Sequence, residues 1–209
     1  MTDGSPSKAR SRFTTGLIVF GFVAGIAMIC IGVGGFGPPR PDPEDSLLDG
    51  APPGHDPMRA SVPTAVRIPG IDVESPLIRV GLDPEGWIEA PPPQDPWTAG
   101  WYDGSVGPGA KGTAVLVGHV DSAVGPAVFY NAGALKKGNR IEVERADGTT
   151  AVFTVYRVKL FDAEDFPGER VYRDTRHAEL RLLTCGGDYT PGAGYSGNTV
   201  VFARLTAVA

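Results

Sequence analysis

The stretch Glu179-Leu180-Arg181-Leu182-Leu183-Thr184-Cys185-Gly186-Gly187 combines a strand-like run, a cysteine and a glycine pair. Residues 180–184 are mostly apolar and end in a β-branched residue. With the glycines as a stop signal, the pattern predicts a buried strand whose last position is Cys185. Glycines lack a Cβ, so the backbone there can turn tightly and present N–H groups to whatever the sulfur attacks. The stretch therefore favours a thiol nucleophile, and the alternative is an inert core cysteine.

The chain from residue 63 onward consists of short strand-like runs separated by turn signals such as Pro69-Gly70 and Ala146-Asp147-Gly148. The expected strands are 64–68, 73–80, 82–88, 114–117, 141–145, 151–160, 180–184 and 199–205. Helical turns are expected only around 128–135 and 163–166, and 90–112 is expected to be a loop. The 29 Gly and 20 Pro also disfavour a helical protein. The pattern predicts an all-β domain, a closed barrel of about eight strands that hides its edges.

The N-terminal region predicts a membrane anchor. An uncharged run occupies residues 16–35, and at about 1.5 Å per residue it is long enough to cross the roughly 30 Å hydrocarbon core. Basic residues precede the run and acidic residues follow it, so the first 15 residues are expected to stay in the cytoplasm and the rest to lie outside. We expect an uncleaved, single-pass signal anchor over 16–36 in the cell membrane. A cleaved signal peptide is the alternative.

Residues 37–62 are rich in Pro, Gly and Asp and contain few apolar side chains. Such a composition predicts a stiffened, solvated linker, with His55 on its surface. The expected organisation is therefore a cytoplasmic N-terminus (1–15), a membrane anchor (16–36), this linker, and one extracellular β-barrel domain (63–209).

Charge and cysteine content exclude several classes of function. A net charge of -5 and a pI near 5.2 disfavour nucleic-acid binding. Cys30 falls in the predicted membrane span and Cys185 in the exterior domain, so the two cannot form a disulfide within one chain. Four-ligand zinc sites need more Cys and His than this chain has. We therefore expect no metal or cofactor. An open metal site formed by His119, Asp121 and Cys185 remains an alternative.

A cysteine nucleophile needs a base, because an ordinary thiol is mostly protonated at neutral pH. His119 follows the apolar run 114–117 after one glycine. The two strand ends can therefore bring an imidazole and the Cys185 thiol to one rim of a barrel. Asp121, two residues further on, would orient the ring or shape the loop. His177 lies in a charged turn and is expected to be solvated. A purely structural role for the His119–Cys185 pair remains the alternative.

The segments Gly118-His119-Val120-Asp121 and Leu182-Leu183-Thr184-Cys185 resemble the sortase family, which carries a G-H-x-[DN] segment and an L-x-T-C strand end. The resemblance covers about residues 63–209 and is greatest to the class F sortases of high-GC Gram-positive bacteria. It extends to the stretches Ile68-Pro69-Gly70-Ile71, Gly100-Trp101-Tyr102, Val115–Ser122, Gly125-Pro126-Ala127-Val128-Phe129, Thr184-Cys185-Gly186-Gly187 and Asn198-Thr199-Val200-Val201-Phe202-Ala203.

The resemblance implies a membrane-anchored transpeptidase that joins secreted proteins to the cell wall. Such enzymes cut an L-P-x-T-G-like C-terminal sorting signal after its Thr, hold the protein as a thioester, and transfer it to an amine of a peptidoglycan precursor. By resemblance, Cys185 is the nucleophile, His119 the general acid/base, and Thr184 a residue that shapes the floor of the substrate site.

The chain departs from the family at its third catalytic residue, an arginine at or just before the last strand. Residues 194–199 contain no arginine, and Ser196 or Asn198 occupies the expected place. Asn198 would offer a neutral amide donor to the oxyanion. Arg204 is about 20 Å further along the strand, and Arg181 shares the strand parity of Cys185. Losing such a donor costs about 10²–10³ in rate. A catalytically weak peptide-binding protein, or a thiol hydrolase that uses water, are therefore the alternatives.

Overall fold

The computed structural model describes residues 37–48 and 50–209. The predicted cytoplasmic segment 1–15 and membrane anchor 16–36 lie outside these residues, as does Cys30. Within the part of the chain that is described, no helix is both long and apolar enough to span a bilayer.

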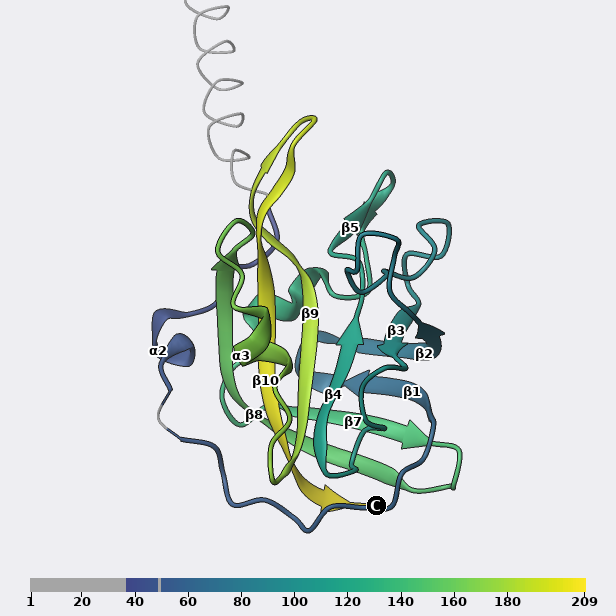
Figure 1. Cartoon of the computed structure of the whole chain (residues 1–209). Helices are drawn as coiled ribbons and strands as arrows, with labels where there is room; N and C mark the ends of the chain where they lie inside the picture. Colours follow the sequence, from purple (N-terminus) through teal and green to yellow (C-terminus); the bar gives the residue numbers. More distant parts are fainter. Residues whose placement is uncertain (1–36, 49) are drawn as a thin grey trace, which may run out of the picture. The chain divides into compact units, whose positions relative to one another are not determined.

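Eight strands close into a barrel in the order β1-β2-β3-β4-β9-β10-β8-β7 (Figure 1). Neighbouring strands are antiparallel except for the parallel pairs β2–β3 and β4–β9. A separate two-stranded hairpin, β5–β6, follows β4. This result confirms the predicted closed barrel of about eight strands. The strands are β1 (Pro63–Ile68), β2 (Val73–Val80), β3 (Ala99–Tyr102), β4 (Gly112–Val117), β5 (Asp121–Ser122), β6 (Gly125–Pro126), β7 (Arg140–Arg145), β8 (Thr150–Asp162), β9 (Ala178–Thr190) and β10 (Gly194–Val208).

The helices of the described residues are short: α2 (Pro43–Ser46), η1 (Pro69–Ile71), η2 (Tyr130–Ala134) and α3 (Gly168–Tyr172). The turn expected around 128–135 is confirmed as η2. The turn expected near 163–166 forms a few residues later, as α3. Pro167 stands at its N-cap, and the residue before a proline is disfavoured in helical conformation, so the helix begins after it.

Two predictions about individual strands are wrong. Residues 82–88 make only the single bridge Leu82–Ile88, and the expected loop 90–112 contains β3. The sequence pattern does not predict β3 because the strand includes Gly100, and glycine is a poor strand former. Glycine is needed at this position: a Cβ there would lie 2.9 Å from a methyl group of Val80 on the neighbouring strand.

The sequence predicts that β9 ends at the glycine pair, and this prediction is wrong. It continues to Thr190, so Cys185 lies within the strand and pairs with Asn198 of β10. The ladder shifts register beyond this pair, and Gly187 adopts φ 88°. Gly186 packs so closely that an added Cβ would lie 2.5 Å from the Thr199 hydroxyl. Gly187 therefore lies at a β-bulge, which bends the strand after the cysteine instead of ending it.

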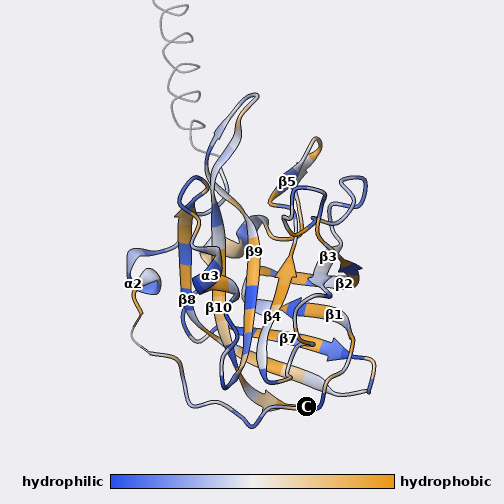
Figure 2. Cartoon of the chain, viewed as in Figure 1, coloured by the Kyte–Doolittle hydropathy of each residue, from blue (hydrophilic) through white to orange (hydrophobic). Residues whose placement is uncertain are grey.

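Alternation along β4 and β9 divides their apolar side chains between two clusters. Leu116, Leu180 and Leu182 fill the barrel interior. Val115 and Leu183 face outward and join a second buried cluster, which α3 covers with Val171. Figure 2 shows β4 as largely hydrophobic and β9 as hydrophobic only in part, with hydrophilic residues between. Because both faces of β4 are covered, its sequence is a nearly continuous apolar run, as is usual for parallel pairs.

Residues 37–62 follow the barrel surface, although their composition predicts a solvated linker. Ser46 donates to the Val158 carbonyl over 3.0 Å, and the His55 and Met58 amides donate to the carbonyls of Leu205 and Gly109 over 2.8 Å. Composition alone does not predict this attachment, which combines hydrogen bonds to distant parts of the chain with packing of Met58 and Val62 against the barrel core. The His55 side chain is exposed, as expected.

Candidate active site

Parallel pairing of β4 with β9 brings the predicted nucleophile and base together. Val117 lies opposite Leu183 in the ladder, and the Gly118 amide donates to the Leu183 carbonyl over 3.2 Å. His119 comes two residues after Val117, and Cys185 comes two residues after Leu183. Adjacent strands lie about 4.8 Å apart, so both residues emerge at the same end of the barrel. They line one cavity of about 340 Å³.

Glycine precedes His119 for a steric reason. A Cβ on Gly118 would lie 2.6 Å from the Phe129 ring and 2.7 Å from a methyl group of Val128. The chain can therefore leave β4 and turn past these buried side chains only with glycine at this position.

The His119 ring is oriented by a backbone carbonyl. Its Nε2 lies 2.7 Å from the Pro91 oxygen. A carbonyl only accepts, so Nε2 carries the proton and donates. In the neutral ring Nδ1 is then the acceptor nitrogen, which is the protonation state that a general base requires. No sequence pattern pointed to Pro91, since its contribution is a main-chain oxygen in a proline run.

Asp121 does not make the contact with His119 that the sequence left open. Its carboxylate accepts a hydrogen bond from the hydroxyl of Tyr195 on β10. Burial raises the pKa of this phenol, and the hydrogen bond to Asp121 raises it further. Tyr195 therefore stays protonated as a donor, and the pair links the β5–β6 hairpin to the β9–β10 hairpin beside Cys185. The other expected role of Asp121, shaping the loop, stays a prediction.

Cys185 is the one free cysteine of the described residues, and it is exposed, which rules out the inert core cysteine. The surrounding strands nevertheless shield one side of the thiol, and this burial raises its pKa. The Asp121 carboxylate raises it further. A raised pKa favours the neutral thiol at rest, so the proton has to be removed as the sulfur attacks.

Thr184 and Asn198 line the same cavity. Thr184 is 5% exposed, and within residues 37–48 and 50–209 its hydroxyl oxygen has no hydrogen-bond partner. The oxygen itself is shielded from solvent, so this hydroxyl is an exception to the rule that buried polar groups are satisfied. Asn198 pairs directly with Cys185 in the ladder, which places a neutral amide next to the sulfur-bearing residue.

No arginine of the described chain lines this cavity. The Arg181 guanidinium donates to Glu179 over 3.1 Å, and Arg204 donates to the same carboxylate over 2.8 Å. Both side chains thus belong to an ion-pair network centred on the buried Glu179. Neither takes the place of the family's arginine in the cavity.

Apolar side chains that the sequence did not single out complete the walls of the cavity. They come from the β2–β3 connection, the β8–β9 connection and α3. The principal ones are Trp87, Ile88, Phe166 and Tyr172. Across residues 37–48 and 50–209, no group of three or more His, Cys, Asp and Glu side chains is arranged to hold a metal ion.

Asp121→Asn is expected to shift the alkylation profile of Cys185 to lower pH. The carboxylate raises the pKa of the thiol, so removing its charge lowers that pKa and increases the thiolate fraction at neutral pH. The measurement is the rate of iodoacetamide labelling as a function of pH. Asp83→Asn, in the β2–β3 connection, is the control and should leave the midpoint unchanged. An unchanged or raised midpoint in Asp121→Asn would show that the Asp121 carboxylate does not raise the pKa of the Cys185 thiol.

Comparison with known proteins agrees with this geometry. The sortase domain family model matches residues 66–206. No curated protein matches the chain by sequence. Among solved structures, a lid mutant of sortase A from Corynebacterium diphtheriae is 22% identical, with a TM-score of 0.52 over 72% of this chain and 73% of that one.

Sortase A from Listeria monocytogenes is 21% identical, with a TM-score of 0.51 over 71% of this chain and 89% of that one. Sortase C1 from Streptococcus agalactiae is 19% identical, with a TM-score of 0.52 over 72% and 71%. At these identities the structures establish the shared fold alone. The family model, however, spans well over half of the 209 residues, and the chain therefore belongs to the sortase domain family.

Proposed function

We propose that this protein is a membrane-anchored cysteine transpeptidase of the class F type. It cleaves an L-P-x-T-G-like sorting signal of secreted proteins and transfers them to an amine of the cell wall. The principal support is that His119, just after β4, and Cys185, within the neighbouring parallel strand β9, line one cavity. The catalytic domain works outside the cell, and residues 16–36 hold it to the membrane.

In this proposal, the Cys185 thiol gives its proton to Nδ1 of His119 while the sulfur attacks the carbonyl carbon of the signal's Thr. The C–N bond then breaks, and the protonated imidazole donates to the departing amine. The product is a thioester that retains the group-transfer potential of the amide. An incoming amine attacks the thioester carbonyl, and its proton passes through His119 back to the leaving sulfur.

The Pro91 carbonyl keeps the imidazole in the tautomer this cycle needs. Thr184 and Asn198 are substrate-side residues: Thr184 shapes the floor of the site, and the Asn198 amide donates to the developing oxyanion.

The test is to incubate the protein with an L-P-x-T-G peptide, with and without a small primary amine, and to follow the products by mass spectrometry. A thioester on Cys185 and a product that depends on amine support the transpeptidase. Free acid at the same rate with or without amine would instead identify a thiol hydrolase.

A catalytically weak peptide-binding protein is the second candidate, because no arginine of the described residues lines the cavity. It predicts peptide binding that persists in Cys185→Ala, together with no turnover by the wild type. Titration calorimetry with the same peptide separates this outcome from the first.

Asn198→Ala is expected to lower kcat by roughly 10²-fold, the usual cost of removing one oxyanion donor, with little change in KM. Ser196→Ala is the matched control, because Ser196 occupies the same segment but its hydroxyl accepts the Asp188 amide. Its turnover should stay near that of the wild type. The reverse ranking of the two variants would assign the donor role to Ser196.

A further inference from the structure

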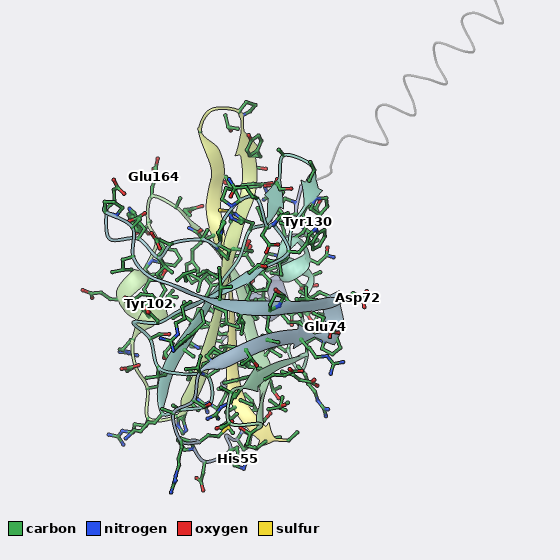
Figure 3. The ribbon with its side chains drawn as sticks, turned by 90° about the vertical axis from the view of Figure 1, so that its right-hand side faces the viewer. His55, Asp72, Glu74, Tyr102, Tyr130 and Glu164 are labelled. Carbon is green, nitrogen blue, oxygen red and sulfur yellow. The ribbon has the colours of Figure 1, made fainter. Side chains whose placement is uncertain are left out.

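The ladder between β4 and β9 ends just before it reaches Cys185. Val117 and Leu183 are its last paired residues, and its last hydrogen bond runs from the Gly118 amide to the Leu183 carbonyl over 3.2 Å. Beyond this point β9 continues to Thr190, paired with β10. The β9–β10 hairpin therefore projects past the tip of β4 (Figure 1), and it stands out from the barrel in the side view as well (Figure 3).

The backbone N–H of Cys185 faces the side on which β4 has ended. The N–H and C=O groups of successive residues in a strand face opposite neighbours. Leu183 turns its carbonyl to β4, so Cys185, two residues further on, faces the same way and not toward β10. Its pair with Asn198 is then of the kind whose members exchange no hydrogen bonds. In the described part of the chain, no backbone carbonyl pairs with the Cys185 N–H on the β4 side.

The candidate cavity lies at this split between the two strands. Its lining includes residues from both sides of the split: Val117, Gly118 and His119 on one, and Leu183, Thr184 and Cys185 on the other. A backbone donor that is buried without a partner costs free energy. Cys185 is exposed, so solvent can satisfy its N–H until a bound group takes the place of solvent.

The same N–H also lies within reach of the Cys185 sulfur. Burial raises the pKa of the Cys185 thiol and Asp121 raises it further, whereas the residue's own N–H lowers this pKa by hydrogen bonding to the thiolate. Negative charge at the sulfur, or on an atom bonded next to it, therefore meets a donor that belongs to the nucleophile's own residue.

We propose that the main-chain N–H of Cys185 is an oxyanion donor of the transpeptidation, together with the Asn198 amide. As the sulfur bonds to the carbonyl carbon of the signal's Thr, the electron pair of the C=O bond moves to the oxygen. The N–H donates to this oxyanion until the C–N bond breaks and the C=O bond re-forms. The inference rests on the proposed thioester chemistry.

The two donors are placed to act on one oxygen. Cβ atoms of directly opposite residues in an antiparallel pair lie about 4.5–5.5 Å apart, so the Asn198 side chain reaches the space beside Cys185. No arginine of the described chain lines the cavity. A main-chain donor supplies stabilisation that needs no such side chain, and it accounts for the turnover that we expect Asn198→Ala to retain.

The test follows the Cys185 N–H by NMR in the full chain in detergent micelles. With Cys30→Ser and isotope-labelled cysteine nitrogen, Cys185 is the one labelled residue. Two L-P-x-T peptides are compared as covalent probes. One ends in an aldehyde, which forms a hemithioacetal and places an oxygen where the oxyanion develops. The other carries an activated disulfide in place of the aldehyde, and its adduct fills the same groove without that oxygen. Mass spectrometry identifies each adduct.

The Cys185 amide proton should shift downfield in the aldehyde adduct and much less in the disulfide adduct. Its exchange with solvent should slow severalfold in the aldehyde adduct alone. The downfield shift should persist in Asn198→Ala, because the backbone donor does not depend on that side chain.

Equal shifts in the two adducts would overturn the inference. Loss of the shift in Asn198→Ala would overturn it as well, and so would an amide proton already protected from exchange in the free protein. Turnover of an L-P-x-T-G peptide by the wild type in the same micelles tests the proposed function separately. Turnover combined with equal shifts would leave the thioester chemistry in place and remove this donor. No turnover and no aldehyde adduct would remove both.

Discussion

Cys185→Ala is expected to abolish turnover of an L-P-x-T-G peptide while leaving the melting temperature nearly unchanged. The thiol is the proposed site of the covalent bond, and alanine offers no other nucleophile. Removing a nucleophile or its base typically costs several powers of ten in kcat, on the order of 10⁶ in the best-studied triad. The residue is exposed, and substitutions at exposed positions usually change stability by less than about 0.5 kcal/mol.

His119→Ala should give the same pattern, because the imidazole is half-buried and its one side-chain hydrogen bond is to Pro91. Product formation is followed by chromatography and unfolding by thermal shift. Thr190→Ala, an exposed position further along β9, is the control and should retain both activity and melting temperature. A large drop in melting temperature for both Cys185→Ala and His119→Ala would show that these side chains serve the core.

The sequence predicted the barrel because most of its strands carry local signals. Turn signals such as Pro69-Gly70 and Ala146-Asp147-Gly148 separate the strands, and apolar runs mark the buried ones. Strand β3 was not predicted because its Gly100 is required by close contact with Val80 on the neighbouring strand. Such a tertiary constraint leaves no local sequence pattern. The same applies to residues 37–62, whose backbone hydrogen bonds reach partners distant in sequence.

The candidate site was predictable in its two principal residues but not in how they meet. Strand-end positions singled out His119 and Cys185. Their proximity depends on the parallel pairing of β4 with β9, which a long stretch of intervening chain separates. The Pro91 carbonyl and the Tyr195–Asp121 hydrogen bond had no sequence signal, because one uses the main chain and the other joins two hairpins.

Arginines lie on β9 and β10 near Cys185, yet none of them lines the cavity, because their side chains are held by Glu179. Arg181 has the parity of Cys185, but β9 passes under α3 at that point, and the guanidinium meets Glu179 and the Val171 carbonyl. Glu179 also accepts from Tyr156 over 2.9 Å. Burial raises the pKa of Tyr156 to about 12, so the phenol remains a donor at every physiological pH.

Glu179→Gln should lower the free energy of unfolding by about 3–5 kcal/mol, the usual cost of removing one partner of a buried ion pair. Glu179 is 1% exposed and Arg181 4% exposed. The isosteric amide therefore leaves two guanidiniums facing a neutral group away from water. Urea unfolding gives the difference. Glu74→Gln is the matched control, because the Arg67–Glu74 pair is solvent-exposed at 3.7 Å and should contribute less than about 1 kcal/mol.

The same variant separates stability from chemistry. If Arg181 and Arg204 only hold β9 and β10 together, then Glu179→Gln keeps the wild-type kcat at temperatures well below its lowered melting point. A fall in kcat under those conditions, with the fold intact by circular dichroism, would mean that a freed guanidinium disturbs the thiol, or that one of these arginines reaches the substrate. A loss of stability below about 1 kcal/mol would show instead that the network is solvated enough to dispense with its carboxylate.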